Sequence, residues 1–213
     1  MAKYKIIDDV GIIPQGVTKI EDEAFYGCAN LTSVVIPDSV TRIGSKAFFG
    51  CYNLVSIDIP DSVTEIESGA FRGCISLKNI VIPDSVTTIG ANAFRGCANL
   101  TSIVIPDSVT TIRSEAFWGC KNLTSIVNPD SVTKIGPSAF YCTGLTNIVI
   151  PDSVTEIGSS AFQFCENLKS IVVEEGNPKY DSRNNCNAII ETATNTLVCG
   201  SSTTIILFKT LSG

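Results

Sequence analysis

Apolar residues return along most of this chain with a period of 23 positions. One period reads Leu-x-x-Ile-x-Ile-Pro-Asp-Ser-Val-Thr-x-Ile-Gly-x-x-Ala-Phe-x-Gly-Cys-x-Asn, with small departures between copies. The opening leucine stands at Leu31, Leu54, Leu77, Leu100, Leu123 and Leu145, with a shortened copy before Asn30 and a decaying copy from Leu168. Such self-similarity is typical of a solenoid, in which each unit buries its apolar face only against its neighbours.

Each unit predicts two short extended segments and one turn of helix. In residues 100–105 the first, fourth and sixth positions are apolar, which predicts a strand with those side chains turned inward. Pro106 ends that strand because proline has no N–H to donate. Residues 109–112 are β-branched throughout and predict a second strand. The Ser-x-Ala-Phe stretch, as at residues 45–48, predicts one helical turn with the serine as its cap.

Stacked units place like residues in columns through the core. The phenylalanines near the end of each unit predict one such column: Phe25, Phe48, Phe71, Phe94, Phe117, Phe140 and Phe162. The isoleucines of the second segment predict another: Ile20, Ile43, Ile66, Ile89, Ile112, Ile135 and Ile157. Asn128 stands where every other full copy has an inward isoleucine, so its amide needs a hydrogen-bond partner there.

The repeat phase divides the chain into three parts. We expect residues 14–172 to form the solenoid of 23-residue units, residues 1–13 an amino-terminal cap or partial strand, and residues 173–213 a carboxy-terminal cap. Within the latter, residues 187–191 and 196–198 are apolar β-type runs that predict a hairpin. Caps shield the open core end and the unpaired strand edge of a solenoid.

The motif Leu-x-x-Ile-x-Ile-Pro, followed by Val-Thr-x-Ile-Gly-x-x-Ala-Phe-x-x-Cys, resembles the BspA-like (Treponema-type) leucine-rich repeat family over roughly residues 10–172. Residues 174–198 are similar to a segment that interrupts such arrays. The pattern and the resemblance together imply a curved, right-handed, mainly β coil with short helical turns and an irregular β-hairpin as its carboxy-terminal cap. The resemblance also implies a ligand-presenting protein, commonly on bacterial cell surfaces, where relatives act in adhesion to host or bacterial proteins.

Location follows from the resemblance alone, which implies a cell-surface or secreted protein. Residues 1–10 contain no apolar stretch of about 7–15 residues such as a secretory signal carries, so a cytoplasmic location is the alternative. No run of about 18 apolar residues predicts a membrane-spanning helix.

Charge and composition exclude several function classes. The 15 Lys and Arg residues against 21 Asp and Glu give a net charge of −6, which argues against nucleic acid and anionic lipid as partners. Histidine is absent, which excludes Ser-His-Asp and Cys-His catalysis and mixed Cys/His zinc sites. No singular acid–base cluster appears, so we expect neither an enzyme nor a cofactor.

Two repeated polar positions raise the question of a metal or a disulfide. We interpret the repeated cysteine as a small buried residue rather than a bridge or ligand: Cys28, Cys51, Cys74, Cys97, Cys120, Cys142 and Cys165. Only Cys186 and Cys199 remain as a candidate disulfide. The repeated aspartate is ordinary turn chemistry after proline, so no metal is expected: Asp38, Asp61, Asp84, Asp107, Asp130 and Asp152.

The residue after each core phenylalanine varies within the Tyr, Trp and Arg vocabulary of interface hot spots. These candidate partner-binding residues are Tyr26, Phe49, Arg72, Arg95, Trp118 and Tyr141, with Gln163 at the same position of the last copy. If they face solvent, they form an aromatic–arginine stripe of interface character. The alternative is that they lie across neighbouring turns and cover the core.

A second candidate surface is the solvent side of the first strand, the concave face in this fold type. Its candidate partner-binding residues are Val35, Asp58, Lys78, Val81 and Val104, set among serines and threonines. Such a sheet suits packing against a protein better than it suits catalysis.

The sequence therefore predicts a non-enzymatic module that binds another protein, with a host matrix or bacterial surface protein as the expected partner. One alternative is carbohydrate binding, with Tyr26, Trp118 and Tyr141 stacking on sugar rings. Another is a spacer fragment of a longer repeat array. We expect a monomer or weak end-to-end association.

Overall fold

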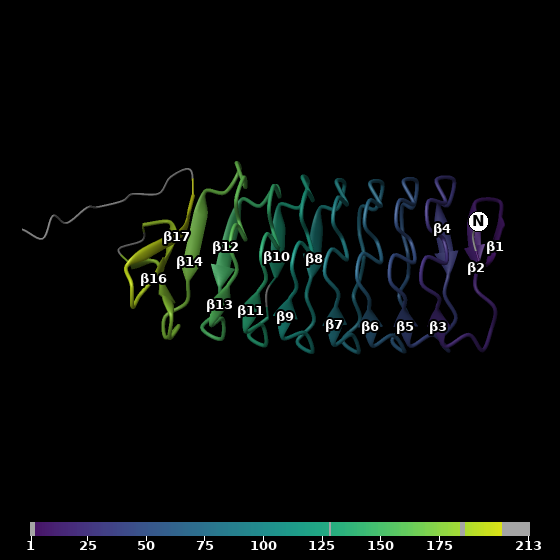
Figure 1. Cartoon of the computed structure of the whole chain (residues 1–213), viewed down its shortest axis with the longest axis horizontal. Helices are drawn as coiled ribbons and strands as arrows, with labels where there is room; N and C mark the ends of the chain where they lie inside the picture. Colours follow the sequence, from purple (N-terminus) through teal and green to yellow (C-terminus); the bar gives the residue numbers. More distant parts are fainter. Residues whose placement is uncertain (1–2, 128, 184–185, 202–213) are drawn as a thin grey trace, which may run out of the picture.

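The chain is a row of stacked coils (Figure 1). The computed structural model describes residues 3–127, 129–183 and 186–201, so the prediction for Asn128 lies outside the described residues. The coils follow one another along the long axis, with the hairpin β1–β2 at the amino-terminal end and β16–β17 at the other end. The predicted solenoid is confirmed.

One side of the row consists of two-residue strands, one for each coil. They pair in parallel and in register, in the orders β3-β5-β6-β7 and β13-β11-β9. Each strand turns its isoleucine inward, fully buried in all of them except β13, where Ile157 is half-buried. The strands are β3 (Lys19–Ile20), β5 (Arg42–Ile43), β6 (Glu65–Ile66), β7 (Thr88–Ile89), β9 (Thr111–Ile112), β11 (Lys134–Ile135) and β13 (Glu156–Ile157).

The other strand-bearing side, here called the first-strand face, is built from the Leu-x-x-Ile-x-Ile segments. Its elements are the antiparallel hairpin β1 (Lys5–Ile7) and β2 (Val10–Ile12), then β4 (Ser33–Val35), β8 (Ser102–Val104), β10 (Ser125–Val127), β12 (Asn147–Ile150) and β14 (Ser170–Val173). Parallel pairs join β2 to β4, β8 to β10, and β12 to β14.

On the first-strand face, the hydrogen-bonded ladder of strands is interrupted between β4 and β8. In the coils that begin at Leu54 and Leu77 the first segment is not paired as a strand. One backbone hydrogen bond remains at each step here: the N–H of Val55 donates to Thr32 at 3.0 Å and that of Lys78 donates to Val55 at 3.4 Å. The coils are therefore held together in this region mainly by their other sides.

The expected turn of helix is wrong in detail, because the described residues contain no α-helix. Instead each coil makes successive tight turns, as where the N–H of Ala47 donates to Gly44 and that of Phe49 to Lys46. Lys46 has a φ of 54°, in the left-handed region, which a right-handed helix cannot include. Intervening amides donate to the next coil, and Ser45 Oγ likewise donates to the Ser68 carbonyl there rather than capping a helix. We call this the turn side.

The phenylalanine column forms as predicted. Its rings stack with centroids 5.3–5.5 Å apart and planes within 2–9° of each other. Tyr4 continues the column at the amino-terminal end, with its centroid 5.7 Å from that of Phe25. All seven phenylalanines are buried, so the centre of the molecule is one continuous aromatic stack.

The cysteine column also forms, with one correction. Each buried thiol donates to a phenylalanine carbonyl of the preceding coil, as from Cys97 to Phe71 at 3.2 Å. Cys142 does not belong to this column: it takes the left-handed glycine position, with a φ of 56°. Because that unit is one residue shorter, Thr143 occupies the cysteine place, and its hydroxyl donates to Phe140 at 2.9 Å.

All nine cysteines are free thiols, so no bridge joins Cys186 to Cys199 in the structure. Burial raises the pKa of Cys51 to about 12 and that of Cys97 well above its ordinary value. Both thiols therefore stay protonated at neutral pH, which favours the structural interpretation of the column.

The carboxy-terminal end carries an antiparallel sheet of β15 (Tyr180–Asp181), β16 (Ala188–Glu191) and β17 (Thr196–Gly200), so the predicted hairpin is confirmed. Asn177 fastens this region to the last coils. Its Nδ2 donates to the carbonyls of Pro151 and Val154 at 2.8 and 2.9 Å, and its Oδ1 accepts the N–H groups of residues 179 and 180. The division at residues 14 and 172 stays a prediction.

Candidate functional site

The first-strand face presents a column of exposed aliphatic side chains. Val35, Val81 and Val104 expose 56%, 79% and 62% of their surface, and Asp58 lies between the first two. Strand register extends the column toward both ends of the molecule, since Ile12 pairs with Val35 and Val149 with Val172. Sequence reasoning did not select Ile12 or Val172, although both stand at the same position of their segments.

Lys78 is also exposed, at the second position of its coil. The selected residues of this face thus share one side of the molecule. Asp58, Lys78 and Val81 lie in the two coils where the strand ladder is interrupted.

The aromatic–arginine stripe is a set of stacked side chains on the turn side. Tyr26 stacks on Phe49 with centroids 4.7 Å apart and planes 3° apart, and Arg72 lies over Phe49 at 5.2 Å. Further along, Arg95 lies 4.2 Å over the ring of Trp118, which stacks on Tyr141 at 5.6 Å. All six predicted residues thus form one file.

Exposure supports both interpretations of this stripe. Tyr26 is exposed, and the other five side chains are half-buried. The aromatic rings and guanidinium groups stack on one another along the file, and each side chain keeps part of its surface exposed. Aromatic edges and stacked guanidinium groups are typical of protein interfaces.

The stripe ends on Phe164 rather than on Gln163. Phe164 occupies the place of the glycine in other units, has a φ of 60°, and exposes 55% of its surface. Its ring meets that of Tyr141 edge-on at 5.1 Å. The sequence could have indicated this role for Phe164, because the glycine expected between Phe162 and Cys165 is missing.

Tyr52 and Ile75 are further exposed apolar side chains that sequence reasoning missed. Both follow a column cysteine, at a position that varies between copies. A methyl group added at Gly50 would lie 3.8 Å from the Tyr52 ring, so this ring lies against the glycines of the turn side. Variation at one repeat position also identified the stripe, so the same criterion could have identified Tyr52 and Ile75.

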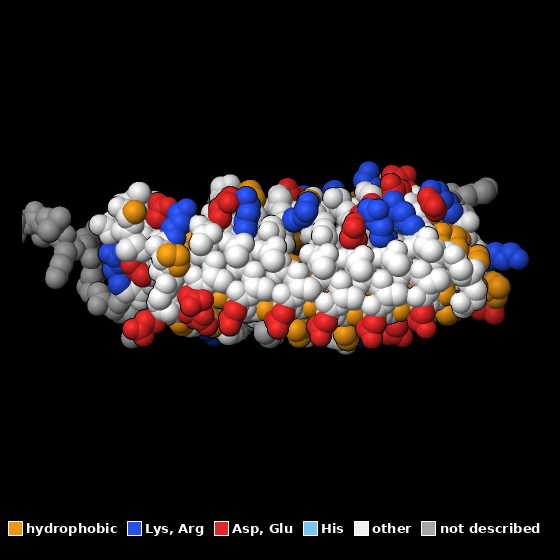
Figure 2. All heavy atoms as spheres, turned by 90° about the horizontal axis from the view of Figure 1, so that it is seen from below, with side chains coloured by type: hydrophobic (Ala, Val, Ile, Leu, Met, Phe, Trp, Pro, Cys, Tyr) orange, Lys and Arg blue, Asp and Glu red, His pale blue; other side chains and the backbone are white. Residues whose placement is uncertain are grey.

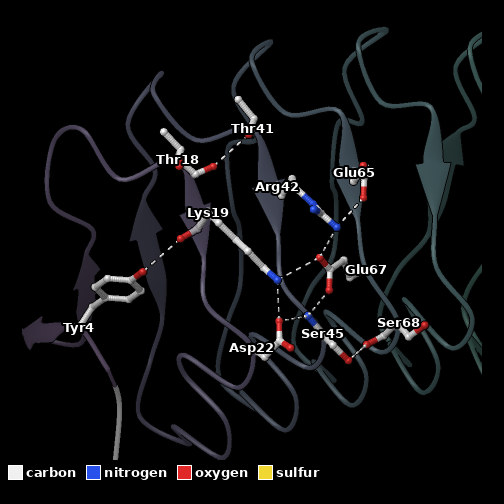
Figure 3. A network of polar contacts seen from close by, with 10 residues as sticks. All are labelled: Tyr4, Thr18, Lys19, Asp22, Thr41, Arg42, Ser45, Glu65, Glu67 and Ser68. Atoms are coloured by element: carbon white, nitrogen blue, oxygen red, sulfur yellow. Dashed lines mark hydrogen bonds and ion pairs between the residues drawn. The ribbon is translucent and has the colours of Figure 1, made fainter.

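An ion-pair network joins three coils beside the two-residue strands (Figure 3). Glu67, which replaces the glycine of most units, lies 3.2 Å from Lys19 and 2.9 Å from Arg42, and it accepts the Ser45 N–H at 3.1 Å. Asp22 contacts Lys19 at 3.1 Å, and that hydrogen bond raises the pKa of Lys19 and lowers the pKa of Asp22. Every charge in this network has a partner, so its role is to hold coils together.

Acidic side chains line one long edge of the molecule (Figure 2). The aspartates that follow the prolines recur once per coil and are exposed: Asp38, Asp61, Asp84, Asp107, Asp130 and Asp152. Across the part of the chain that the structure describes, no three His, Cys, Asp or Glu side chains gather as a possible metal site.

A hollow of about 530 Å³ lies between the last coil and β17. Its lining includes Glu166, Cys165 and Cys199. Burial raises the pKa of both thiols, that of Cys199 to about 11. Thiols held in the protonated form beside a single carboxylate do not make a nucleophile and a base.

Stacked coils with exposed columns define a repeat solenoid of the leucine-rich type, which is a protein-interaction module. The sequence matches the BspA type leucine rich repeat region, six copies, over residues 10–122 and 87–204. The chain therefore belongs to the BspA-type leucine-rich repeat family, and the resemblance noted in the sequence is confirmed.

Solved structures support the same conclusion. A leucine rich cell surface protein from Faecalibacterium prausnitzii A2-165 is 37% identical and superposes with a TM-score of 0.81 over 89% of this chain and 53% of that chain. The chain thus spans about half the length of that protein. The T. pallidum Leucine Rich Repeat protein is 28% identical with a TM-score of 0.51, over 79% of each chain.

The pneumococcal vaccine antigen PcpA shares the fold, with 22% identity and a TM-score of 0.55 over 88% of this chain and 45% of that one. No curated protein matches the chain. Among the described residues, none belongs to a helix long and apolar enough to cross a membrane.

Proposed function

We propose that this protein is a non-enzymatic module of bacterial cell-surface adhesion that binds another protein through its first-strand face. The observation that carries the proposal is the column of exposed valines, above all Val81 and Val104. Isolated exposed apolar residues are ordinary, but aliphatic side chains at the same position of successive coils form a strip, which Asp58 interrupts between Val35 and Val81. Burying such a strip against a partner releases its water and favours association.

The surroundings of the valines suit a protein partner. Serine and threonine side chains flank them, and Asp58 and Lys78 supply one charge of each sign. Charges within or beside an apolar strip select a partner and set its orientation more than they add affinity.

Location at the cell surface is part of the proposal and is supported by similarity to a protein of known structure. The F. prausnitzii relative, which superposes on this chain with a TM-score of 0.81, is a leucine rich cell surface protein. A surface location also makes a host matrix or bacterial surface protein the expected partner.

Geometry does not favour sugar stacking on the stripe. The Trp118 ring has Arg95 on it at 4.2 Å and stacks on Tyr141, and Tyr26 stacks on Phe49. A sugar ring needs a free aromatic face, whereas Trp118 already has Arg95 and Tyr141 against its ring and Tyr26 has one face on Phe49. The protein-binding proposal is therefore preferred to the carbohydrate alternative.

Capture of extracellular-matrix and bacterial surface proteins by the immobilised chain tests the proposal. We expect at least one partner to bind at micromolar concentration. The double variant Val81→Lys/Val104→Lys should weaken that binding about tenfold or more. The double variant Thr64→Lys/Thr87→Lys adds the same charge at exposed positions beside the two-residue strands and should bind normally. A wild-type chain that captures only glycans, or no protein at all, contradicts the proposal.

A further inference from the structure

Two arginines stand side by side in the middle of the stripe. Arg72 and Arg95 occupy the same position of successive coils, and each lies over an aromatic ring on its outer side, Phe49 and Trp118 respectively. Along the stripe, the two guanidinium groups therefore lie between the Phe49 ring on one side and the Trp118 ring on the other. Stacking holds both guanidinium groups in place, so little freedom is lost when a ligand binds them.

The two arginines differ in their acidic partners. Glu115 forms an ion pair with Arg95. Within the described ranges no carboxylate pairs with Arg72, whereas Lys19, Arg42, Lys46 and Lys134 each have one. Burial lowers the pKa of Arg95, and the neighbouring positive charge of Arg72 lowers it further. Adjacent like charges repel, and an incoming anion relieves this repulsion.

The glycines that follow the two arginines, Gly73 and Gly96, are half-buried, and the Tyr52 ring lies 4.0 Å from a methyl group added at Gly73. The glycines that follow Arg95 and Trp118 have φ values of 74° and 72°. A methyl group added at Gly96 or Gly119 would meet only neighbouring glycine backbone, at 3.9 and 4.0 Å, and no side chain. Ile75, two residues after Gly73, is also exposed.

We propose that the Arg72–Arg95 pair and the adjoining glycine row bind an acidic peptide segment of a partner protein. One ligand carboxylate pairs with Arg72, a second approaches Arg95, and apolar ligand side chains contact the edges of the flanking rings and Ile75. Guanidinium groups pair with carboxylates through two parallel hydrogen bonds, which fixes the orientation of the ligand. This site lies on the turn side and does not depend on binding at the first-strand face.

Charge decides between a peptide and a sulfated polysaccharide. The chain carries a net charge of −6, so a long polyanion is repelled by most of the molecule. Two adjacent guanidinium groups match a short segment with two carboxylates. The flanking rings add apolar contacts that a sulfated saccharide uses poorly.

Trp118 is the single tryptophan of the chain, and its emission therefore reports on this site. The probe is the end-blocked synthetic peptide Glu-Gly-Glu-Phe, with Gln-Gly-Gln-Phe as its neutral match and a heparin-derived tetrasaccharide as the sulfated ligand. We expect the acidic peptide to change the emission saturably by about 1 mM, and the neutral peptide to leave it unchanged. Equal effects of both peptides, or a response to the saccharide alone, overturn the proposal.

Variants locate the binding. Arg72→Gln should weaken binding of the acidic peptide about tenfold, because it removes the guanidinium group that lacks an acidic partner. Arg113→Gln removes an exposed arginine outside the stripe and should bind normally, as should Val81→Lys on the first-strand face. Thermal unfolding by circular dichroism confirms that each variant folds. Wild-type affinity in a folded Arg72→Gln variant contradicts the assignment.

Discussion

The ring of Phe94 stacks on that of Phe117 with centroids 5.5 Å apart and planes 2° apart. The two residues are one repeat apart, and neither has any solvent exposure. A ring in this column contacts one ring above and one below, so the burial of each coil depends on both neighbours. The stability of the array is therefore cooperative along its axis.

Truncation of a central ring should destabilise the whole array. We expect Phe94→Ala to lower the free energy of unfolding by about 3–5 kcal/mol, because it opens a cavity in a continuous stack. Urea unfolding followed by circular dichroism measures the change. The matched variant Phe164→Ala, at an exposed ring, should cost less than about 1 kcal/mol. Equal losses at the two positions are inconsistent with the stack as the centre of stability.

Asn177 should contribute to the stability of the carboxy-terminal region through its hydrogen bonds. Asn177→Ala removes four hydrogen bonds and leaves the carbonyls of Pro151 and Val154 without this donor. We expect a loss of about 1–3 kcal/mol in the same unfolding measurement. Asn53→Ala, at an exposed asparagine, is the control and should change stability by less than about 0.5 kcal/mol. Matching effects would show that the region is not fastened through Asn177.

Alkaline pH should weaken the fold through the cysteine column. The pKa of Cys51 lies at about 12 in the folded chain against an ordinary value of 9.0, and burial is the cause. Since the unfolded thiol loses its proton first, stability is complete below pH 9 and falls as the pH rises toward 12. Thermal unfolding midpoints at pH 8 to 11 should decline less steeply in Cys51→Ser than in the wild type. Parallel declines in the two proteins would remove Cys51 as a cause.

The interrupted ladder of the first-strand face should be visible in hydrogen exchange. Among the described residues, no backbone hydrogen bonds join residues 56–58 to 79–81, whereas β12 and β14 pair along four residues. Amides 56–58 and 79–81 should therefore exchange faster than those of Ile148 and Ile171, as mass spectrometry of peptic fragments measures. Slower or equal exchange at these amides is the contrary result.

The overall architecture could be predicted from the sequence because one pattern repeats in near-identical form. The 23-residue period predicted the Phe94 column, and the alternation of apolar and polar positions predicted that Val81 faces outward. Both predictions needed no knowledge of contacts, because residues one period apart lie above one another in a stack of coils. Each local departure from the period was harder to interpret. One unit is a residue shorter, and there Thr143 rather than Cys142 occupies the cysteine column. A side chain of similar size that donates a hydrogen bond fills this place, whichever residue type supplies it.

Other features depend on contacts between coils that no single unit reveals. Glu67 reaches Lys19 two coils away, and this pairing follows from the stacking distance rather than from the local sequence. Lys46 adopts a left-handed φ although nothing in its side chain favours it, because inter-coil hydrogen bonds fix the turn. The stripe was predicted by position, but its self-stacking, and thus the occupied ring faces, required the structure.

Both proposed surfaces exist only if equal positions of successive repeats stack along one axis. Spin labels at the exposed threonines that directly precede the two-residue strands measure this, in the pairs Thr41–Thr133 and Thr41–Thr155. A strand spacing of about 4.8 Å predicts separations of roughly 19 Å across four coils and 24 Å across five, apart from the lengths of the labels. A rise of about 5 Å between the two pairs supports the account, and equal or irregular separations contradict it.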